Sequence, residues 1–179
     1  MRSYTKPRLQ DEKLKENHLS IEVLKKLKNA DACLYETRLQ AGRCAANAFL
    51  YNEKANSAIS VYTQNQESVH SIVWLILGGV ITGEKAWDLL EKSLSAEHCL
   101  KPFTPYMHHY VLEAMQVLGK REKLEECIKK IWGGMLERGA EVFPEVFVAD
   151  DLEFSPYGDK LVNSACHAWS CTPCYFLRD

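Results

Sequence analysis

A helical hairpin over residues 104–139 is the feature that most restricts how this chain can fold. Thr104 followed by Pro105 is a strong helix start, because the threonine hydroxyl can cap a backbone N–H and proline suits the first helical position. Apolar residues then recur every three or four positions up to Gly119, which is expected to end the helix. The same period resumes after two residues and continues to about Gly139. So short a turn makes the two helices antiparallel neighbours.

Helical periodicity also dominates the rest of the sequence. Two stretches without a clear period, 51–66 and 140–163, are expected to be loops. The segment 67–79 is apolar on nearly all sides, which is typical of a buried helix, and Gly78 and Gly79 can end it. With about seven helices and no convincing strand, the predicted class is all-α. The main expected helices span about residues 29–50, 67–79, 83–98, 104–119, 122–139 and 164–177.

Charge and composition exclude several classes of protein. The 179 residues include 22 Lys plus Arg and 24 Asp plus Glu, a net charge of -2, which excludes a strongly basic nucleic-acid binder. A hydrophobic fraction of 46% is ordinary for a globular chain and rules out wholesale disorder. The longest apolar run, Ile72–Ile81, is shorter than the roughly 20 residues that span a bilayer, so we expect no membrane insertion.

Cysteine usage indicates the compartment. The chain has seven cysteines, an odd number, and its first residues, MRSYTKPRLQDEKLK, lack the apolar core of a secretory signal. An odd count without a signal favours free thiols in a reducing compartment over a disulfide framework. We therefore expect a cytoplasmic protein.

Three segments together resemble a known family. They are TPYMHHYVLEAM (104–115), IWGGMLERGAEVFPE (131–145) and SPYGDKLVNSACHAWSCTPCYFL (155–177), and ESVHSIVWLILGG (67–79) adds a fourth. In order and spacing they are similar to the C-terminal half of the catalytic domain of α-L-rhamnosidases, which are six-hairpin glycoside hydrolases. The resemblance covers roughly residues 30–178.

The resemblance implies an architecture and its missing parts. The family fold is an (α/α)6 toroid, of which the expected helices would make about half. Residues 1–28 would be an N-terminal helical lead-in and 29–179 a partial six-hairpin domain. The family's acid-bearing first half and its C-terminal β-domain have no counterpart here. Because the general acid is missing, we expect this chain alone to be inactive or nearly so on natural glycosides. We expect either that missing half of the barrel or a second copy as partner, because a half barrel would expose residues such as Trp74, Leu75 and Trp132.

The resemblance assigns the catalytic base to Glu145. Inverting glycoside hydrolysis needs one carboxyl group to protonate the leaving oxygen and another to activate water. In the family's pattern the base is the glutamate that closes a Gly-Ala-x-x-x-Trp-Glu segment, which here reads Gly139 to Glu145 with Pro144 in place of the tryptophan. The implied substrate is a terminal α-L-rhamnoside, and loss of that tryptophan leaves the identity of the sugar open. The alternative is that Glu145 is one more solvated acid in an acidic loop.

Three further residues are candidate sugar contacts. His167, in Cys-His-Ala-Trp-Ser, matches a family histidine of the sugar pocket, and its imidazole can bond a sugar hydroxyl or orient a carboxylate. The alternative is a core histidine at the start of a helix with its hydrogen bonds satisfied. Trp169 could stack on a sugar face, although a helical tryptophan more commonly packs in the core. Tyr106, one turn into its helix, could point its hydroxyl toward the same site.

Two other functions compete with hydrolysis. The first is a non-catalytic helical module that binds a carbohydrate or a protein. The second is a zinc or thiol site, because four potential ligands fall within nine residues: Cys166, His167, Cys171 and Cys174. Against zinc, structural sites usually gather ligand pairs from separate segments, and the chain has no second pair. We therefore expect no metal and no cofactor.

Overall fold

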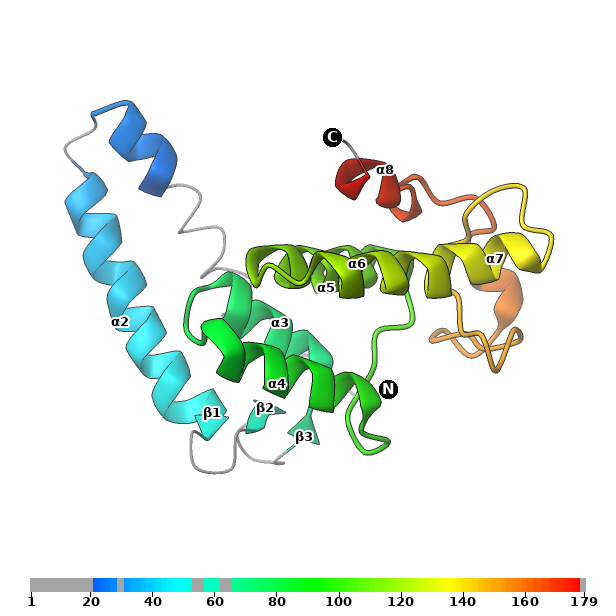
Figure 1. The fold of residues 1–179 in the computed structure, drawn as a ribbon, viewed down its shortest axis with the longest axis horizontal. Helices are drawn as coiled ribbons and strands as arrows, with labels where there is room; N and C mark the ends of the chain where they lie inside the picture. Colours follow the sequence, from blue (N-terminus) through cyan, green and yellow to red (C-terminus); the bar gives the residue numbers. More distant parts are fainter. Residues whose placement is uncertain (1–20, 29–30, 53–56, 62–65, 178–179) are drawn as a thin grey trace. The chain divides into compact units, whose positions relative to one another are not determined.

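The computed structural model describes residues 21–28, 31–52, 57–61 and 66–177 (Figure 1). The chain divides into two compact units, Met1–Lys101 and Pro102–Asp179, and each is described by itself below. The described residues are predominantly helical, so the predicted all-α class is confirmed, with a small sheet added. No described helix combines the length and the apolar character needed to cross a membrane.

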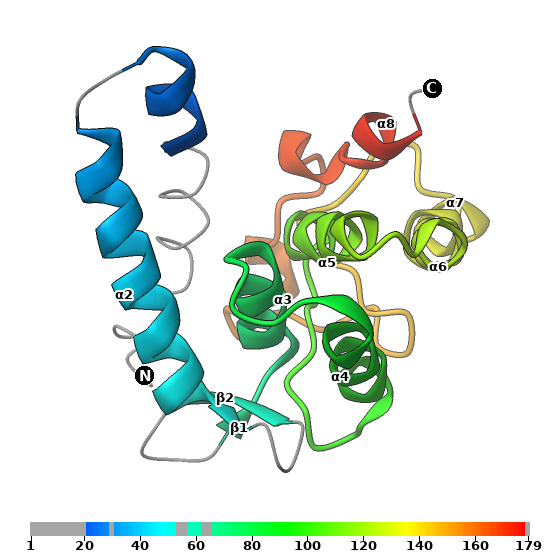
Figure 2. The same cartoon turned by 60° about the vertical axis from the view of Figure 1, so that its left-hand side comes forward.

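The first unit begins with helices and a small sheet. Residues 21–26 are helical, and α2 spans Ala32–Leu50. Strands β1 (Tyr51–Asn52), β2 (Ser57–Val61) and β3 (Gln66–Glu67) follow in the order β1-β2-β3 with antiparallel pairing. The expectation of a loop over 51–66 is therefore wrong for the described residues. β2 lies against α2 and α3 (Figure 2), and Ala58 is fully buried, so packing against helices selects the strand despite its weak sequence pattern.

The core of the first unit is the predicted apolar helix. α3 spans Val69–Leu77, and every one of its residues is buried. It packs against α4 (Gly83–Ser95), which contributes Leu89 and Leu90 to the core. Ser68 caps α3 by accepting the N–H of His70. The side chain of Lys101 donates to the backbone carbonyls of Ser93 and Ala96 at the end of α4. Helix ends that are satisfied in this way are stable when buried.

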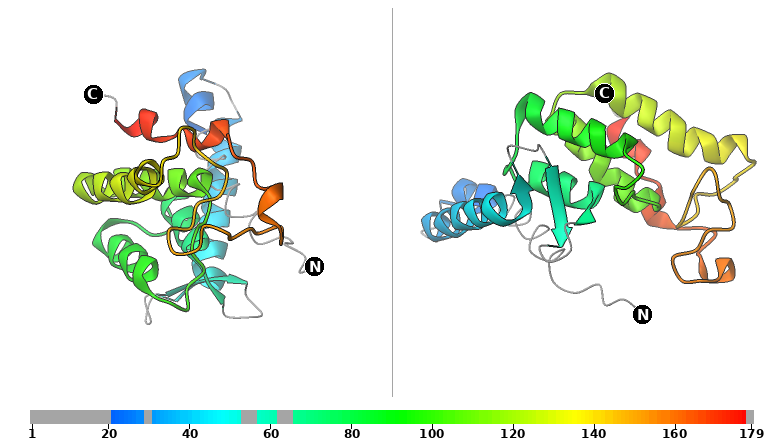
Figure 3. Two further views of the ribbon diagram at one scale, coloured as in Figure 1. Left: turned by 90° about the vertical axis from the view of Figure 1, so that its right-hand side faces the viewer. Right: turned by 90° about the horizontal axis from the view of Figure 1, so that it is seen from below.

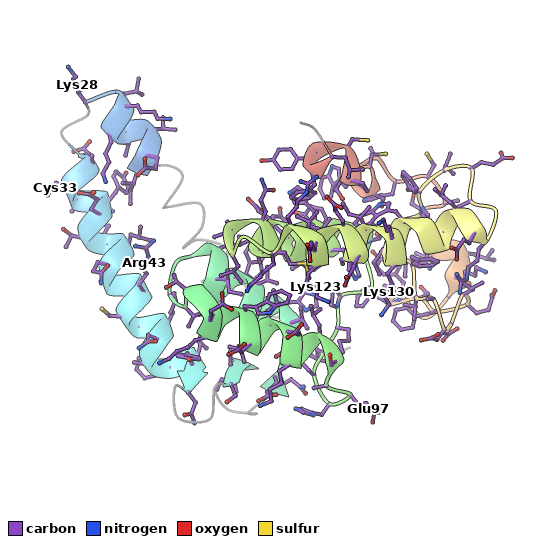
Figure 4. The ribbon with its side chains drawn as sticks, viewed as in Figure 1. Lys28, Cys33, Arg43, Glu97, Lys123 and Lys130 are labelled. Carbon is purple, nitrogen blue, oxygen red and sulfur yellow. The ribbon has the colours of Figure 1, made fainter. Side chains whose placement is uncertain are left out.

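A single arginine joins α2 to the end of α3. The side chain of Arg43, labelled on α2 in Figure 4, donates from Nε to the carbonyl of Gly78 at 2.8 Å. The next residue, Gly79, has φ +69°, which L side chains rarely adopt. A Cβ at Gly79 would lie 2.7 Å from Nη2 of Arg43. Glycine therefore suits the left-handed backbone of this turn, and a Cβ there would have to displace the guanidinium of Arg43.

We expect Gly79→Ala to destabilise the chain more than Gly83→Ala. Gly83 also has a positive φ, +67°, but a Cβ there meets nothing within 4 Å. Each substitution should cost about 1–2 kcal/mol for a left-handed alanine, and only Gly79→Ala should also displace Arg43. Urea unfolding of both variants measures the difference. Equal losses would show that the contact with Arg43 contributes nothing.

The second unit is built on the predicted hairpin. α5 spans Pro105–Val117 and starts as expected, since Thr104 Oγ1 accepts the N–H of Met107 at 3.2 Å. After Gly119, with φ +70°, the chain returns as α6 (Arg121–Ile128), the π-helical segment η1 (Lys129–Gly133) and α7 (Gly134–Glu137). The helical hairpin is thereby confirmed.

After α7 the chain is irregular, as predicted (Figure 3). It holds the short helices η2 (Lys160–Val162), η3 (Ala168–Ser170) and α8 (Pro173–Phe176). The continuous last helix expected from Ser164 is therefore wrong. Pro173 explains part of the break. Proline has no backbone N–H to donate within a helix, so it interrupts one, but it suits the first turn of a new helix.

The side chains expected to lie exposed at the edge of a half barrel are buried. Trp74 is 4%, Leu75 0% and Trp132 3% exposed. The argument for a partner based on these three residues is therefore wrong. Other large apolar side chains are exposed in the second unit, including Trp169, Tyr175 and Leu177.

Candidate functional site

The backbone around Glu145 is held by a neighbouring segment of the second unit. The N–H of Glu145 donates to the carbonyl of Ser164 at 2.9 Å, and the N–H of His167 donates to the carbonyl of Phe143 at 2.9 Å. Two residues after Glu145, the N–H of Phe147 donates to the carbonyl of Phe103 at 2.9 Å. Glu145 thus lies in an irregular segment whose backbone is nonetheless fixed on both sides, which suits a functional group on a loop.

The Glu145 carboxylate accepts a hydrogen bond on each oxygen. The hydroxyl of Tyr157 donates to Oε1 at 2.7 Å, and the N–H of Ser164 donates to Oε2 at 3.1 Å. The Tyr157 hydrogen bond, followed by the Ser164 N–H, lowers the pKa of Glu145; partial burial acts against them, and the charge of His167 adds the smallest lowering effect. Groups that bond the charged form of an acid favour that form, so this carboxylate stays ionised to lower pH than a free glutamate.

The neighbouring acids differ from Glu145. Glu141, Asp150 and Asp151 are exposed, whereas Glu145 is half-buried. Asp151 uses one oxygen to accept the N–H of Glu153 in a local turn. The structure therefore separates Glu145 from the solvated acids of its loop.

Three aromatic side chains form a row that begins at His167, whose charge acts on this carboxylate. The His167 and Trp169 rings lie 5.8 Å apart, and Trp169 lies 4.9 Å from Tyr106 at the start of α5. The Tyr106 hydroxyl is 3.0 Å from that of Tyr110. Trp169 is 63% exposed, so the alternative of a core tryptophan is wrong. The four residues singled out from the sequence are thus neighbours, while their roles stay predictions.

Two buried residues that were not predicted as site residues, Ser170 and Trp132, support this row. Ser170, fully buried at 0% exposure, donates from Oγ to the carbonyl of Pro144 at 2.8 Å. Its own carbonyl accepts the indole N–H of Trp132 at 2.7 Å. Trp132 lies in the π-helical segment η1, and such segments alter the direction of side chains along a helix. Pro144, which departs from the family pattern, therefore contributes its carbonyl to this network.

Tyr157 is the other group that sequence reasoning missed. It lies in the segment SPYG (155–158), which carried the family resemblance, but twelve residues from Glu145 in a stretch without period. Only the turn residues Pro156 and Gly158 gave a signal that the segment is ordered.

The cysteines do not form a metal centre in the described residues. All seven are free thiols. No group of three or more His, Cys, Asp or Glu side chains that could hold a metal ion occurs in the described part of the chain. The CxxC residues Cys171 and Cys174 are exposed on either side of the start of α8. The zinc alternative thus gains no support.

Comparisons with solved structures identify similar proteins. No protein-family model matches the sequence, and no curated protein matches it either. A rhamnosidase from Klebsiella oxytoca with rhamnose bound is 32% identical with a TM-score of 0.88, over 96% of this chain and 33% of that chain. A GH78 family rhamnosidase of Bacillus sp. GL1, 24% identical with a TM-score of 0.76 over 92% of this chain and 18% of that chain, shares the fold. The resemblance to rhamnosidases is thereby confirmed, and this chain spans about a third of the Klebsiella protein.

Proposed function

We propose that this chain, which is similar to a part of rhamnosidases over nearly all of its length, is the base-carrying part of a glycoside hydrolase. The reaction is the inverting hydrolysis of terminal α-L-rhamnosides. The observation that carries the proposal is the carboxylate of Glu145, which is half-buried, oriented by two donors and kept ionised.

The chemistry assigned to Glu145 is general base catalysis. An ionised carboxylate offers about four lone-pair positions, and two hydrogen bonds leave room to accept a proton from water. In an inverting hydrolase that water attacks the anomeric carbon on the face opposite the leaving group. The carboxylate takes the proton of the water as the new C–O bond forms and the glycosidic bond breaks.

The row of aromatic side chains supports a sugar ligand. Rhamnose is a 6-deoxy sugar, so it presents a methyl group and C–H faces alongside its hydroxyls. Trp169 and Tyr106, 63% and 39% exposed, offer ring faces for the apolar side, and His167 offers an imidazole for a hydroxyl. The Klebsiella oxytoca structure has rhamnose bound, which supports a carbohydrate as ligand.

The general acid belongs to the part of the rhamnosidase fold that this chain does not span. In inverting enzymes the two carboxyl groups stand about 6.5–9.5 Å apart across the sugar. The proposed assembly is an (α/α)6 toroid, completed by the other half of the barrel or by self-association. All seven free cysteines are consistent with placing this assembly in a reducing compartment such as the cytoplasm.

Two substrates with different leaving groups test the proposal. A dinitrophenyl α-L-rhamnoside hardly needs protonation of its leaving group, whereas methyl α-L-rhamnoside depends on it. We expect the chain to release dinitrophenol measurably and to leave the methyl glycoside nearly untouched, because general acid catalysis contributes roughly 10²–10⁴-fold. Initial rates by absorbance and by NMR give both values. No release from the activated substrate would contradict the proposal.

A non-catalytic carbohydrate-binding module is the second candidate. The strong exposure of Trp169 beside Tyr106 favours it, since exposed aromatic pairs commonly serve as binding surfaces. This candidate predicts saturable binding of L-rhamnose without turnover. It also predicts that binding persists in Glu145→Gln and is lost in Trp169→Ala.

A further inference from the structure

Both donors to the Glu145 carboxylate come from one loop, residues 155–164. The Tyr157 hydroxyl bonds Oε1 at 2.7 Å, and the Ser164 N–H bonds Oε2 at 3.1 Å. One donor is a side chain near the start of the loop, and the other is the backbone at its end. The two oxygens are therefore fixed only if the loop keeps its two ends in place.

A tight turn fixes the Tyr157 end of the loop. The N–H of Gly158 donates to the carbonyl of Ser155 at 3.3 Å, and Gly158 has φ +87°, which suits glycine. The N–H of Tyr157 also donates to the hydroxyl of Ser155 at 3.1 Å. Tyr157 is 56% exposed, so this turn and the carboxylate, rather than core packing, set its position.

The same serine links the turn to the Ser164 end. Ser155 donates from its hydroxyl to Oδ1 of Asn163 at 2.9 Å. The side-chain Nδ2 of Asn163 donates to the backbone carbonyl of Phe154 at 3.1 Å. Asn163 directly precedes Ser164. The side chain of Asn163 therefore closes the 155–164 loop and holds its two carboxylate donors at a fixed separation.

We propose that Tyr157 is a positioning residue, which together with the Ser164 N–H holds the Glu145 carboxylate in one orientation. With both oxygens fixed, the remaining lone pairs keep a constant direction toward the attacking water. The consequence for hydrolysis rests on the proposed function, but the orientation of the carboxylate does not.

The electrostatics of the pair agree with this geometry. The hydrogen bond from Tyr157 is the largest influence that lowers the pKa of Glu145, and the same bond raises the pKa of Tyr157. Tyr157 thus keeps its proton, and its hydroxyl donates a hydrogen bond to the ionised carboxylate of Glu145. His167 is the other ionisable group that acts on Glu145, and its charge lowers the same pKa.

Tyr157→Phe separates this role from a structural one. Removing the hydroxyl should raise the pKa of Glu145, because one donor to the charged form is lost. The pKa is measured by following the side-chain carboxyl carbon by NMR as pH is varied. On the dinitrophenyl substrate, kcat/KM should fall by up to roughly 10²-fold, with KM little changed, and the acidic limb of the pH profile should move to higher pH.

Tyr175→Phe is the matched control. Tyr175 is 58% exposed in the same unit and contacts His109 and Phe176, so its hydroxyl should leave the pKa of Glu145 and the rate unchanged. An unchanged Glu145 pKa in Tyr157→Phe would overturn the proposal, whatever the activity. So would a raised pKa with an unchanged kcat/KM. If the pKa rises and the unsubstituted chain hydrolyses nothing, the proposed hydrolysis fails and the assignment of Tyr157 stands.

Discussion

Replacing Trp132 by alanine is expected to lower the free energy of unfolding by about 3–5 kcal/mol, as large-to-small core substitutions do. Trp132 is only 3% exposed, and its ring and that of His108 are T-shaped to one another, with centroids 6.4 Å apart. The loss has two sources. The cavity removes packing in the second unit, and the carbonyl of Ser170 loses the indole N–H that bonds it at 2.7 Å. Urea unfolding followed by circular dichroism measures the change.

Two other tryptophan variants make this prediction specific. Trp132→Phe keeps most of the volume but loses the indole N–H, so it should cost less than Trp132→Ala. Trp169→Ala removes an equally large side chain that is 63% exposed, and it should change stability far less. A Trp132→Ala variant as stable as Trp169→Ala would contradict the burial and hydrogen bond described for Trp132.

Glu145→Gln is expected to reduce hydrolysis of the dinitrophenyl substrate by roughly 10²–10⁴-fold, the usual contribution of a general base. The amide keeps the size of the side chain, and its carbonyl can still accept from Tyr157. It cannot take a proton from water at neutral pH. The initial rates of the two proteins, with KM measured for each, give the change.

Glu141→Gln is the control for the loss of one charge. Glu141 lies in the same irregular segment and is exposed, so its substitution should change the rate little. If both variants lose activity equally, the loss reflects the charge of the loop. If Glu145→Gln retains full activity, Glu145 is not the base.

Local signals predicted the hairpin well. Thr104 and Pro105 start α5, and Gly119 ends the turn through its backbone freedom, so no distant residue is needed to fix these ends. α3 was equally clear, because a run that is apolar on all sides can be stable only when it is buried.

Elements that depend on distant partners were not predictable. The pairing of Tyr51 with Ala58 and of Ile59 with Glu67 is short, and polar neighbours hide its alternation. Trp132 was expected at an exposed flank, yet the segment that covers it lies nearly forty residues later in the chain at Ser170. Burial of this kind follows from tertiary packing, so the residues next to Trp132 in the sequence do not indicate it.

In the candidate site, too, some residues were predictable from local patterns and others were not. The family motifs indicated Glu145, His167, Trp169 and Tyr106 because each lies within a recognisable local pattern. The contact of Tyr157 with Glu145 arises only when the turn at Gly158 folds back, and the support from Ser170 needs two segments to meet. Sequence patterns thus indicate candidate site residues more readily than the groups that orient them.

The configuration of the sugar first released from a dinitrophenyl α-L-rhamnoside tests the central claim most directly. Proton NMR distinguishes the two anomers before they interconvert. If Glu145 activates a water that attacks opposite the leaving group, the first product is β-L-rhamnose. Initial release of α-L-rhamnose, or no release of sugar at all, would contradict inverting hydrolysis by this chain.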